Sequence, residues 1–386
     1  MAYNTTIFRQ MLQICSRLEF QNIVKRHKGD YRVRKLSCWG QFIHLLFAQL
    51  GDRSSLRDTV SCSNSQSEKL YHLGCAPAYR STLAVANSKR PYQIYRDLFF
   101  KLLNRSQSIA PKYKLKLPRK LFIMDSTTVD LCLKLFPWAR FRTTKGGVKI
   151  HTLMQADGLL PTFLIVTDGK GQDTKVAYKF DVEPGSFIVF DRGYHDFNLY
   201  KRYTDNKIRF VTKAKSNARY ETLTQVWTGN TTGVLSDETI QFTGYNTRRK
   251  YPGKLRKITF YDELNDKTHV FLSNEFKLKA DTIADIYKAR WEIELFFKTV
   301  KQNLKIKRFM GTSKNAVLTQ VYVAMIAYLL VSYHKFMLKS KHSVQTIIRL
   351  IQINLFERKP LDQLIKHAGF KPPDIEPNLQ CSLIGI

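Results

Sequence analysis

Three carboxylates stand at positions where they could hold divalent metal ions. Asp125 ends an apolar run that begins at Leu121, and Asp191 ends a second run that begins at Phe187. Glu294 lies further on, inside a long amphipathic segment. Hard ions such as Mg²⁺ take carboxylate oxygens as ligands, and a pair of them can clamp the attacking and leaving oxygens of a phosphodiester. The three acids therefore predict phosphodiester chemistry with two Mg²⁺ ions, which Mn²⁺ can replace.

Glu294 belongs to an ordered polar stripe. On a helix over residues 280–305, Tyr287, Arg290, Glu294 and Lys301 fall within about 60° of one another, at the margin of the apolar face. A side chain at such a margin can reach a ligand while its helix stays packed, and Arg, Lys and Tyr can hold phosphates. The alternative is an ordinary salt-bridged helix border, because Arg290 and Glu294 are an i, i+4 pair.

The charge of the chain points to a polyanionic partner. Sixty-three Lys+Arg against 31 Asp+Glu give a net charge of +32. Such a charge repels itself unless a polyanion is bound, and counterion release from phosphates makes DNA or RNA the leading candidate. Residues 1–120 hold half of that charge and have helical patterning. They predict either a helical DNA-binding region or a helical scaffold with solvated charge.

The composition fits a folded protein of two or three units. The chain has 386 residues, of which 44% are hydrophobic. Its six cysteines show no C-x-x-C pair, which argues against a zinc site and favours free thiols in a reducing cytoplasm. The first twenty residues contain no apolar signal region. The apolar stretch 316–333 is interrupted by Thr319 and Gln320 and predicts a buried helix, with no membrane partner.

The patterning along the chain predicts an α/β protein with four regions. Residues 1–115 form the basic helical region, and 116–215 form a sheet in which three antiparallel strands and a helix precede a returning strand. This order suits a ribonuclease-H-like core, with Asp125 and Asp191 side by side at the ends of neighbouring strands. Turn-rich residues 216–277 predict an inserted β-rich subdomain, and 278–386 complete the core and add carboxy-terminal helices.

The segment from Tyr287 to Glu294, followed by Lys301, matches Y-x2-R-x3-E-x6-K. This is the signature of the insertion-sequence-four family of bacterial DDE transposases, which the chain resembles over nearly its whole length. Residues 124–127 and 191–194 look like that family's first and second aspartate motifs. The resemblance implies that Asp125, Asp191 and Glu294 bind the metals, and that Tyr287, Arg290 and Lys301 contact phosphates.

The resemblance also implies a function and its partners. A transposase of this family binds the terminal inverted repeats of its element as a homodimer. It nicks the element end, forms a DNA hairpin through the freed 3′-hydroxyl, and joins the end to target DNA. We therefore expect double-stranded DNA as the partner, and a bacterial cytoplasmic protein associated with the nucleoid.

Further side chains are candidates for DNA contact. Trp291, or Trp227 in the insertion, could stack on a flipped base, although core or rim packing is the more frequent role of tryptophan. Arg192, Lys145 and Lys149 could line the DNA track or form a solvated basic face. His195 could approach the metals, although a surface position on the turn after Asp191 is the simpler expectation.

Two other functions remain open from the sequence. A structure-specific nuclease on the same sheet would cut DNA without joining it. A transposase-derived regulator would bind DNA with an inactive site. The complete set of three acids favours an active enzyme over the regulator, because unpaired acids held close together are costly.

Overall fold

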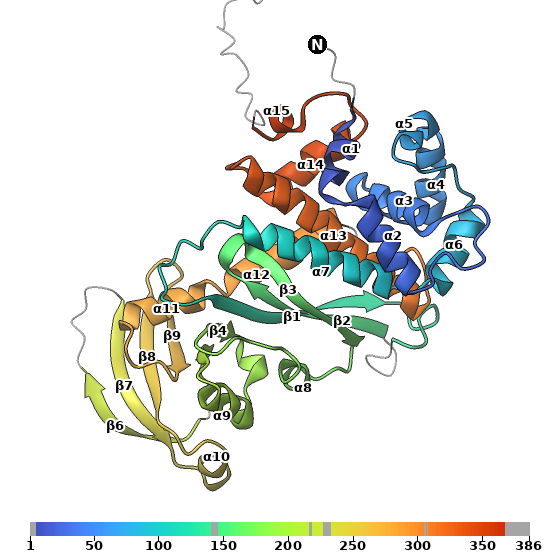
Figure 1. Cartoon of the computed structure of the whole chain (residues 1–386). Coiled ribbons are helices and arrows are strands. Elements are labelled where there is room, and N and C mark those ends of the chain that lie inside the picture. Colours follow the sequence, from blue (N-terminus) through green and yellow to red (C-terminus); the bar gives the residue numbers. More distant parts are fainter. Residues whose placement is uncertain are drawn as a thin grey trace, which may run out of the picture.

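The protein is described by a computed structural model, which covers residues 5–139, 146–215, 218–226, 233–304, 306 and 308–366. A helical region leads into a mixed nine-stranded sheet, and further helices follow the sheet (Figure 1). The predicted α/β class with a helical amino-terminal region is confirmed.

The amino-terminal region consists of short helices around one long core helix of the carboxy-terminal part. Ser37 and Ser55 begin α3 and α4 by accepting hydrogen bonds from backbone N–H groups three residues on. The helices are α1 (Ile7–Met11), η1 (Leu12–Ile14), α2 (Arg17–Arg26), α3 (Cys38–Leu50), α4 (Leu56–Asn64), α5 (Ser67–Tyr71), α6 (Arg80–Lys89) and α7 (Gln93–Ser108).

The strands form a single sheet in the order β3-β2-β1-β4-β5-β9-β8-β7-β6. β1 pairs antiparallel with β2 and parallel with β4, and β4 pairs parallel with β5. The first five strands are β1 (Leu121–Leu131), β2 (Gly146–Gln155), β3 (Leu160–Asp168), β4 (Phe187–Phe190) and β5 (Arg209–Lys213). The predicted pairing of the first and fourth strands is therefore confirmed.

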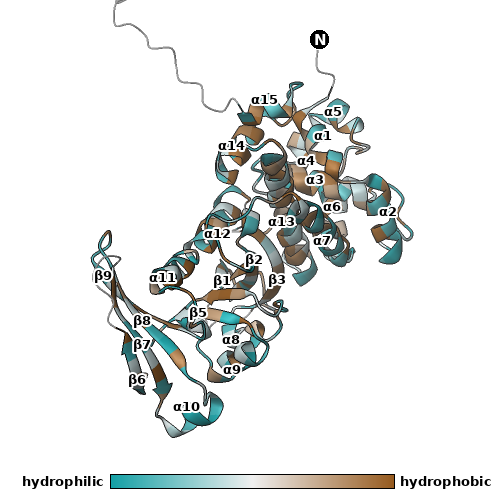
Figure 2. Cartoon of the chain, turned by 60° about the vertical axis from the view of Figure 1, so that its left-hand side comes forward, coloured by the Kyte–Doolittle hydropathy of each residue, from teal (hydrophilic) through white to brown (hydrophobic). Residues whose placement is uncertain are grey.

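The turn-rich region adds four antiparallel strands to the same sheet. They are β6 (Tyr220–Val226), β7 (Val234–Phe242), β8 (Leu255–Asp262) and β9 (Lys267–Ser273), with α10 (Tyr245–Lys250) between β7 and β8. β9 pairs with β5, so these strands continue the sheet past its parallel part. Figure 2 shows them standing away from the helical body.

Helices cover the two faces of the sheet. One face carries α8 (Asp173–Ala177) and α9 (Phe197–Asp205), which pack on residues such as Met124, Phe190 and Phe210. The other face carries α11 (Ala280–Lys288) and α12 (Trp291–Asn303), which pack on residues such as Ile123, Val189 and Val211. Because side chains alternate along a strand, each strand has a fixed set of residues on the α12 face.

The carboxy-terminal helices join the sheet to the amino-terminal region. They are α13 (Lys314–Met337), α14 (Val344–Asn354) and α15 (Leu361–Lys366). α13 lies along α7 and α3, and it is the one helix among the described residues that is long and apolar enough to cross a membrane (Figure 1). Its apolar window is 94% buried inside the protein. The prediction of a buried helix is confirmed.

Two expected elements have different bounds in the structure. β1 does not end at Asp125 but continues for six residues to Leu131, because its second half pairs with β2. The helix expected over 280–305 is interrupted at Ala289 and Arg290, where α11 ends and α12 begins. The polar stripe therefore spans two helices rather than one.

Candidate functional site

Strand pairing brings the two aspartates together. Met124 of β1 is the register partner of Phe190 of β4 in a parallel pair, so Asp125 and Asp191 follow side by side. Asp125 lies two residues after Ile123, and Asp191 lies two residues after Val189. Because side chains two residues apart on a strand share a face, both aspartates lie on the α12 face of the sheet. Asp125 lies inside β1, and Asp191 lies directly after β4, where its carboxylate accepts a hydrogen bond from the Arg192 backbone N–H.

Arg290 connects Glu294 to this pair. Its Nη2 lies 2.6 Å from Glu294 Oε1, and its Nη1 lies 3.5 Å from Asp125 Oδ2. Residue 290 lies between α11 and α12, and its guanidinium contacts both carboxylates. Arg290 Nε is buried without a hydrogen-bond partner among the described residues.

The surroundings of Asp125 disfavour the ionised form of its carboxyl. Its side chain is only 19% exposed, and burial raises the pKa of its carboxyl to about 6. The Ser126 backbone N–H and the Arg290 guanidinium oppose this rise in pKa, whereas the charges of Asp191 and Glu294 add to it. The three acids therefore lie close enough to influence one another, and a cation placed among them would relieve the excess negative charge.

The expectation that three carboxylates already meet around one point is not met. In the part of the chain that the structure describes, no three His, Cys, Asp or Glu side chains are arranged to hold one ion together. The Arg290 guanidinium contacts both Asp125 and Glu294, so these two carboxylates lie on either side of one cation. Its 3.5 Å contact with Asp125 is at the limit of a hydrogen bond, so this separation is held weakly.

A buried polar network supports the strand next to Asp125. Ser126 donates its backbone N–H to Asp125 Oδ1 at 2.7 Å and its hydroxyl to Asp173 Oδ1 at 2.7 Å. Asp173 also pairs with the Lys149 ammonium and lies 3.2 Å from Nδ1 of the fully buried His151. Burial opposes but does not cancel the effect of these partners, which lower the pKa of the Asp173 carboxyl.

Sequence patterns did not identify Asp173, which lies in a polar segment between strands. The network also determines the surroundings of the Lys149 ammonium. Its ammonium faces Asp173 and its side chain is 18% exposed, so its charge is not presented on a solvated basic face.

An open pocket of about 410 Å³ lies beside these acids. Asp125, Glu294 and Lys301 line it together, as does Lys298, which the sequence analysis missed although it lies four residues after Glu294 on α12. Lys301 Nζ donates a 2.8 Å hydrogen bond to the Thr128 carbonyl oxygen, which fixes the end of α12 against β1.

The aromatic residues of the stripe have different surroundings. The ring of Tyr287 packs against Phe271 of β9 in a tilted arrangement at a centroid distance of 4.6 Å, and burial raises the pKa of its hydroxyl. Trp291 begins α12 and is 59% exposed, so it is not a core residue.

The remaining candidates separate into three groups. Arg192 is exposed beside Asp191. His195 accepts or donates a 2.8 Å hydrogen bond with the Tyr200 hydroxyl, and burial lowers its pKa to about 4. Its ring packs against Phe197 and Tyr200 and is half-buried, so the expectation of a surface position on this turn was wrong. Lys145 and Trp227 lie outside the described residues.

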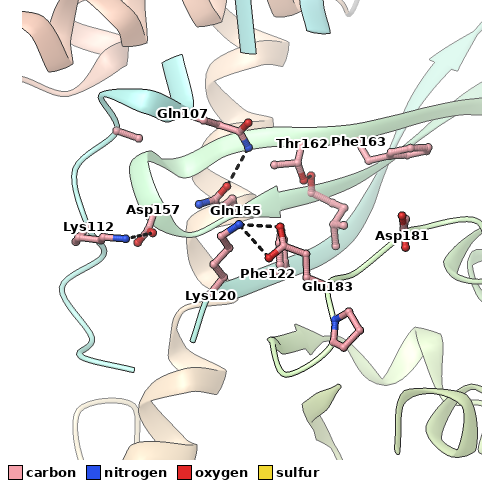
Figure 3. Close-up of a pocket in the computed structure, with 13 residues that line it drawn as sticks. Gln107, Lys112, Lys120, Phe122, Gln155, Asp157, Thr162, Phe163, Asp181 and Glu183 are labelled. Carbon is pink, nitrogen blue, oxygen red and sulfur yellow. Dashed lines mark hydrogen bonds and ion pairs between the residues drawn. The ribbon is translucent and has the colours of Figure 1, made fainter. Parts of the chain in front are cut away.

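A larger pocket, of about 560 Å³, lies beside the start of β1. Its polar contacts are Gln107 to Gln155, Lys112 to Asp157 and Lys120 to Glu183 (Figure 3). The two lysines are each paired with an acid, and none of the three predicted acids lines the pocket. It therefore carries no chemistry of the predicted kind.

Residues 116–330 match the family model described as the transposase DDE domain, and residues 3–76 match a domain of unknown function (DUF4372). A Sinorhizobium fredii protein named as a transposase is 31% identical over 77% of this chain and 81% of its own length. A Geobacillus stearothermophilus protein named as the transposase of an insertion sequence element is 28% identical over 66% of each chain.

One solved structure is also similar to this chain. It is a piggyBac transposase synaptic complex with hairpin DNA, with a TM-score of 0.47 and 11% identity. The match covers 97% of this chain and 84% of the other.

Proposed function

The chain belongs to the DDE transposase family, and from this premise we propose that it is the transposase of an insertion sequence that cuts the element's ends and joins them to target DNA. Cleavage through a hairpin intermediate is part of the proposal. The observation that carries it is the register of β1 and β4, which sets Asp125 beside Asp191, with Glu294 tied to Asp125 through Arg290.

The catalytic core is proposed to be ribonuclease-H-like. The order β3-β2-β1-β4-β5, with β2 antiparallel and β4 and β5 parallel to β1, supports this assignment. The helices on both faces support it as well. In this proposal β6 to β9 are an insertion that extends the sheet before α11 and α12 complete the site.

Asp125, Asp191 and Glu294 are the residues that would hold Mg²⁺ or Mn²⁺. Their oxygens are the donors that such ions prefer, and the raised pKa of Asp125 identifies a place that favours a neighbouring cation. Two bound ions supply charge neutralisation at the attacking and leaving oxygens. The contact of Arg290 with Asp125 would have to open for the carboxylates to converge.

The cations and aromatic residues beside the acids would orient the DNA. Arg290 would attract a phosphate through its charge beside Asp125 and Glu294, and Lys301 and Lys298 line the pocket that these two acids share. Exposed Trp291, next to Arg290, would stack on a base displaced near the hairpin. These groups bind and position the phosphodiester, so no covalent enzyme intermediate is needed.

The wider partners follow from the same proposal. Double-stranded DNA, as terminal inverted repeats and as target, would engage the basic amino-terminal helices. Two copies of the chain would hold two element ends as a homodimer. The protein would act in the bacterial cytoplasm, on nucleoid DNA.

The test uses labelled duplexes that carry the inverted repeats flanking the gene, with Mg²⁺. We expect hairpin ends and joined products. Nicks alone would assign a structure-specific nuclease instead. Binding with no cleavage would assign a regulator and overturn the enzymatic proposal.

A further inference from the structure

We propose that Lys213, together with Lys267 and Arg192, forms a separate binding site for a DNA backbone phosphate, on the side of Asp191 away from Asp125. The inference rests on the proposed function and assigns a DNA contact to residues outside the polar stripe of α11 and α12. It places part of the substrate on the strands β5 and β9.

Strand register fixes the position of this site. Phe190 of β4 is the partner of Thr212 of β5 in a parallel pair, so Lys213 follows beside Asp191. Lys213 in turn pairs with Phe271 of β9. Lys213 lies two residues after Val211 on β5, so its side chain is on the α12 face, as are those of Asp125 and Asp191. One row of side chains therefore runs across β1, β4 and β5.

The ammonium of Lys213 is oriented by a neutral partner. Its Nζ donates a hydrogen bond to His269 Nδ1 at 3.2 Å. Burial and the charge of Lys213 lower the pKa of His269, which keeps this ring nitrogen available as an acceptor at neutral pH. Phe271, the register partner of Lys213, packs against the ring of Tyr287. Lys213 thus has two further donors free to point away from His269.

Three cations lie near Lys213, with the Asp191 carboxylate beside it and Asp262 opposite Lys267 on β8. Burial lowers the pKa of Lys213, and so do the charges of Arg192, Arg290 and Lys267, with Asp191 as the opposing acid. Cations gathered this closely repel one another unless an anion lies among them. Lys213 is partly exposed, and Arg192 and Lys267 are exposed, so an anion from solution can reach all three.

A DNA backbone fits this cluster because it presents phosphates at regular intervals. Neighbouring strands lie about 4.8 Å apart, so Lys213 is about 10 Å from Asp125 across β4. A DNA strand advances about 3.4 Å per nucleotide, which puts the bound phosphate within about three nucleotides of the reacting bond. The cluster would hold the strand on that side of the bond while Arg290 and Lys301 hold the other.

The test measures binding of the full chain to a fluorescent duplex that carries the flanking inverted repeat, over a range of salt concentrations. Each lost phosphate contact should reduce the slope of log affinity against log salt by about 0.9. We expect the double variant Lys213→Gln/Lys267→Gln to lose about 1.8 from that slope, and Lys213→Arg to keep the wild-type slope. Lys201→Gln is the matched control, because it removes an exposed charge from α9 on the opposite face.

A second measurement uses the unmodified protein and does not depend on how well a variant folds. Lysine acetylation read by mass spectrometry should be slower at Lys213 when the duplex is bound, and unchanged at Lys201. If the wild-type chain binds and cleaves the duplex while Lys213 stays equally reactive and the double variant keeps its slope, this inference is wrong and the proposed function stands. If the wild-type chain neither binds nor cleaves it, both are wrong.

Discussion

The replacement Asp125→Asn should make the protein more stable while it abolishes DNA cleavage. Burial and the neighbouring acids raise the pKa of this carboxyl from an ordinary value near 4 to about 6. Two pKa units correspond to about 3 kcal/mol, which is the most that the ionised carboxylate costs the folded state. Asparagine keeps the shape of the side chain and removes that cost.

The sign of the pH dependence follows from the direction of the change in pKa. Between pH 4 and pH 6 the folded protein keeps a proton on Asp125 that the unfolded chain has released. The contribution of Asp125 to the free energy of unfolding therefore falls as the pH rises through this window, and is constant above it. Asparagine does not titrate, so the variant does not lose this stability. The free energies of unfolding of the two proteins should therefore differ little at pH 4 and by up to about 3 kcal/mol at pH 7.

Thermal unfolding of both proteins over this pH range measures the effect, which amounts to a few degrees for a chain of this size. Asp130→Asn is the control, because Asp130 is an exposed residue of the same strand. Added Mg²⁺ should raise the melting temperature of the wild-type protein, by about 2.7 kcal/mol of stability at 100 times its Kd, and leave that of the variant unchanged. A variant that melts below the wild type at pH 7, or a difference that does not vary with pH, would refute the reasoning.

Three further predictions concern the surroundings of Asp125. Glu294→Gln should retain DNA affinity and lose at least about a hundredfold in cleavage rate, measured on labelled element ends. A wild-type cleavage rate would show that Glu294 is not a residue of the metal site. Lys301→Ala should weaken binding to the cleaved end and reduce the salt slope by about 0.9, and an unchanged slope would count against a phosphate contact. Asp173→Ala should cost about 3 kcal/mol in chemical denaturation, because it leaves Lys149 without its partner in a largely buried position. Since its partners lower the pKa of Asp173, the stabilisation that they give is present above pH 4 and is lost as the pH falls below it. Equal stability of the wild type and the Asp173 variant at pH 7 would contradict the role of the network.

The sequence predicted those features that depend on local patterning. The apolar runs before Asp125 and Asp191 form adjacent strands, as expected. The apolar stretch 316–333 is a buried helix, also as expected. The signature around Tyr287, Arg290 and Glu294 identified the family, because its spacing is fixed by one short segment of the chain.

The tertiary structure decided which of these residues are neighbours. Apolar alternation tells which face of a strand is buried, but the length of each pairing and the joining of β9 to β5 depend on contacts between distant segments. That pairing carries β1 past Asp125 and joins β9 to β5. It also places Arg290 between two carboxylates that the sequence had put around a common point.

The sequence by itself therefore determined which chemistry the side chains offer, because residue types and short spacings can be read from it directly. The position of Lys213 beside Asp191, and the network around Ser126, came only from the folded protein. Lys213 and Asp173 belong to no motif, and their roles arise from charges and strand registers supplied by segments far away in the sequence.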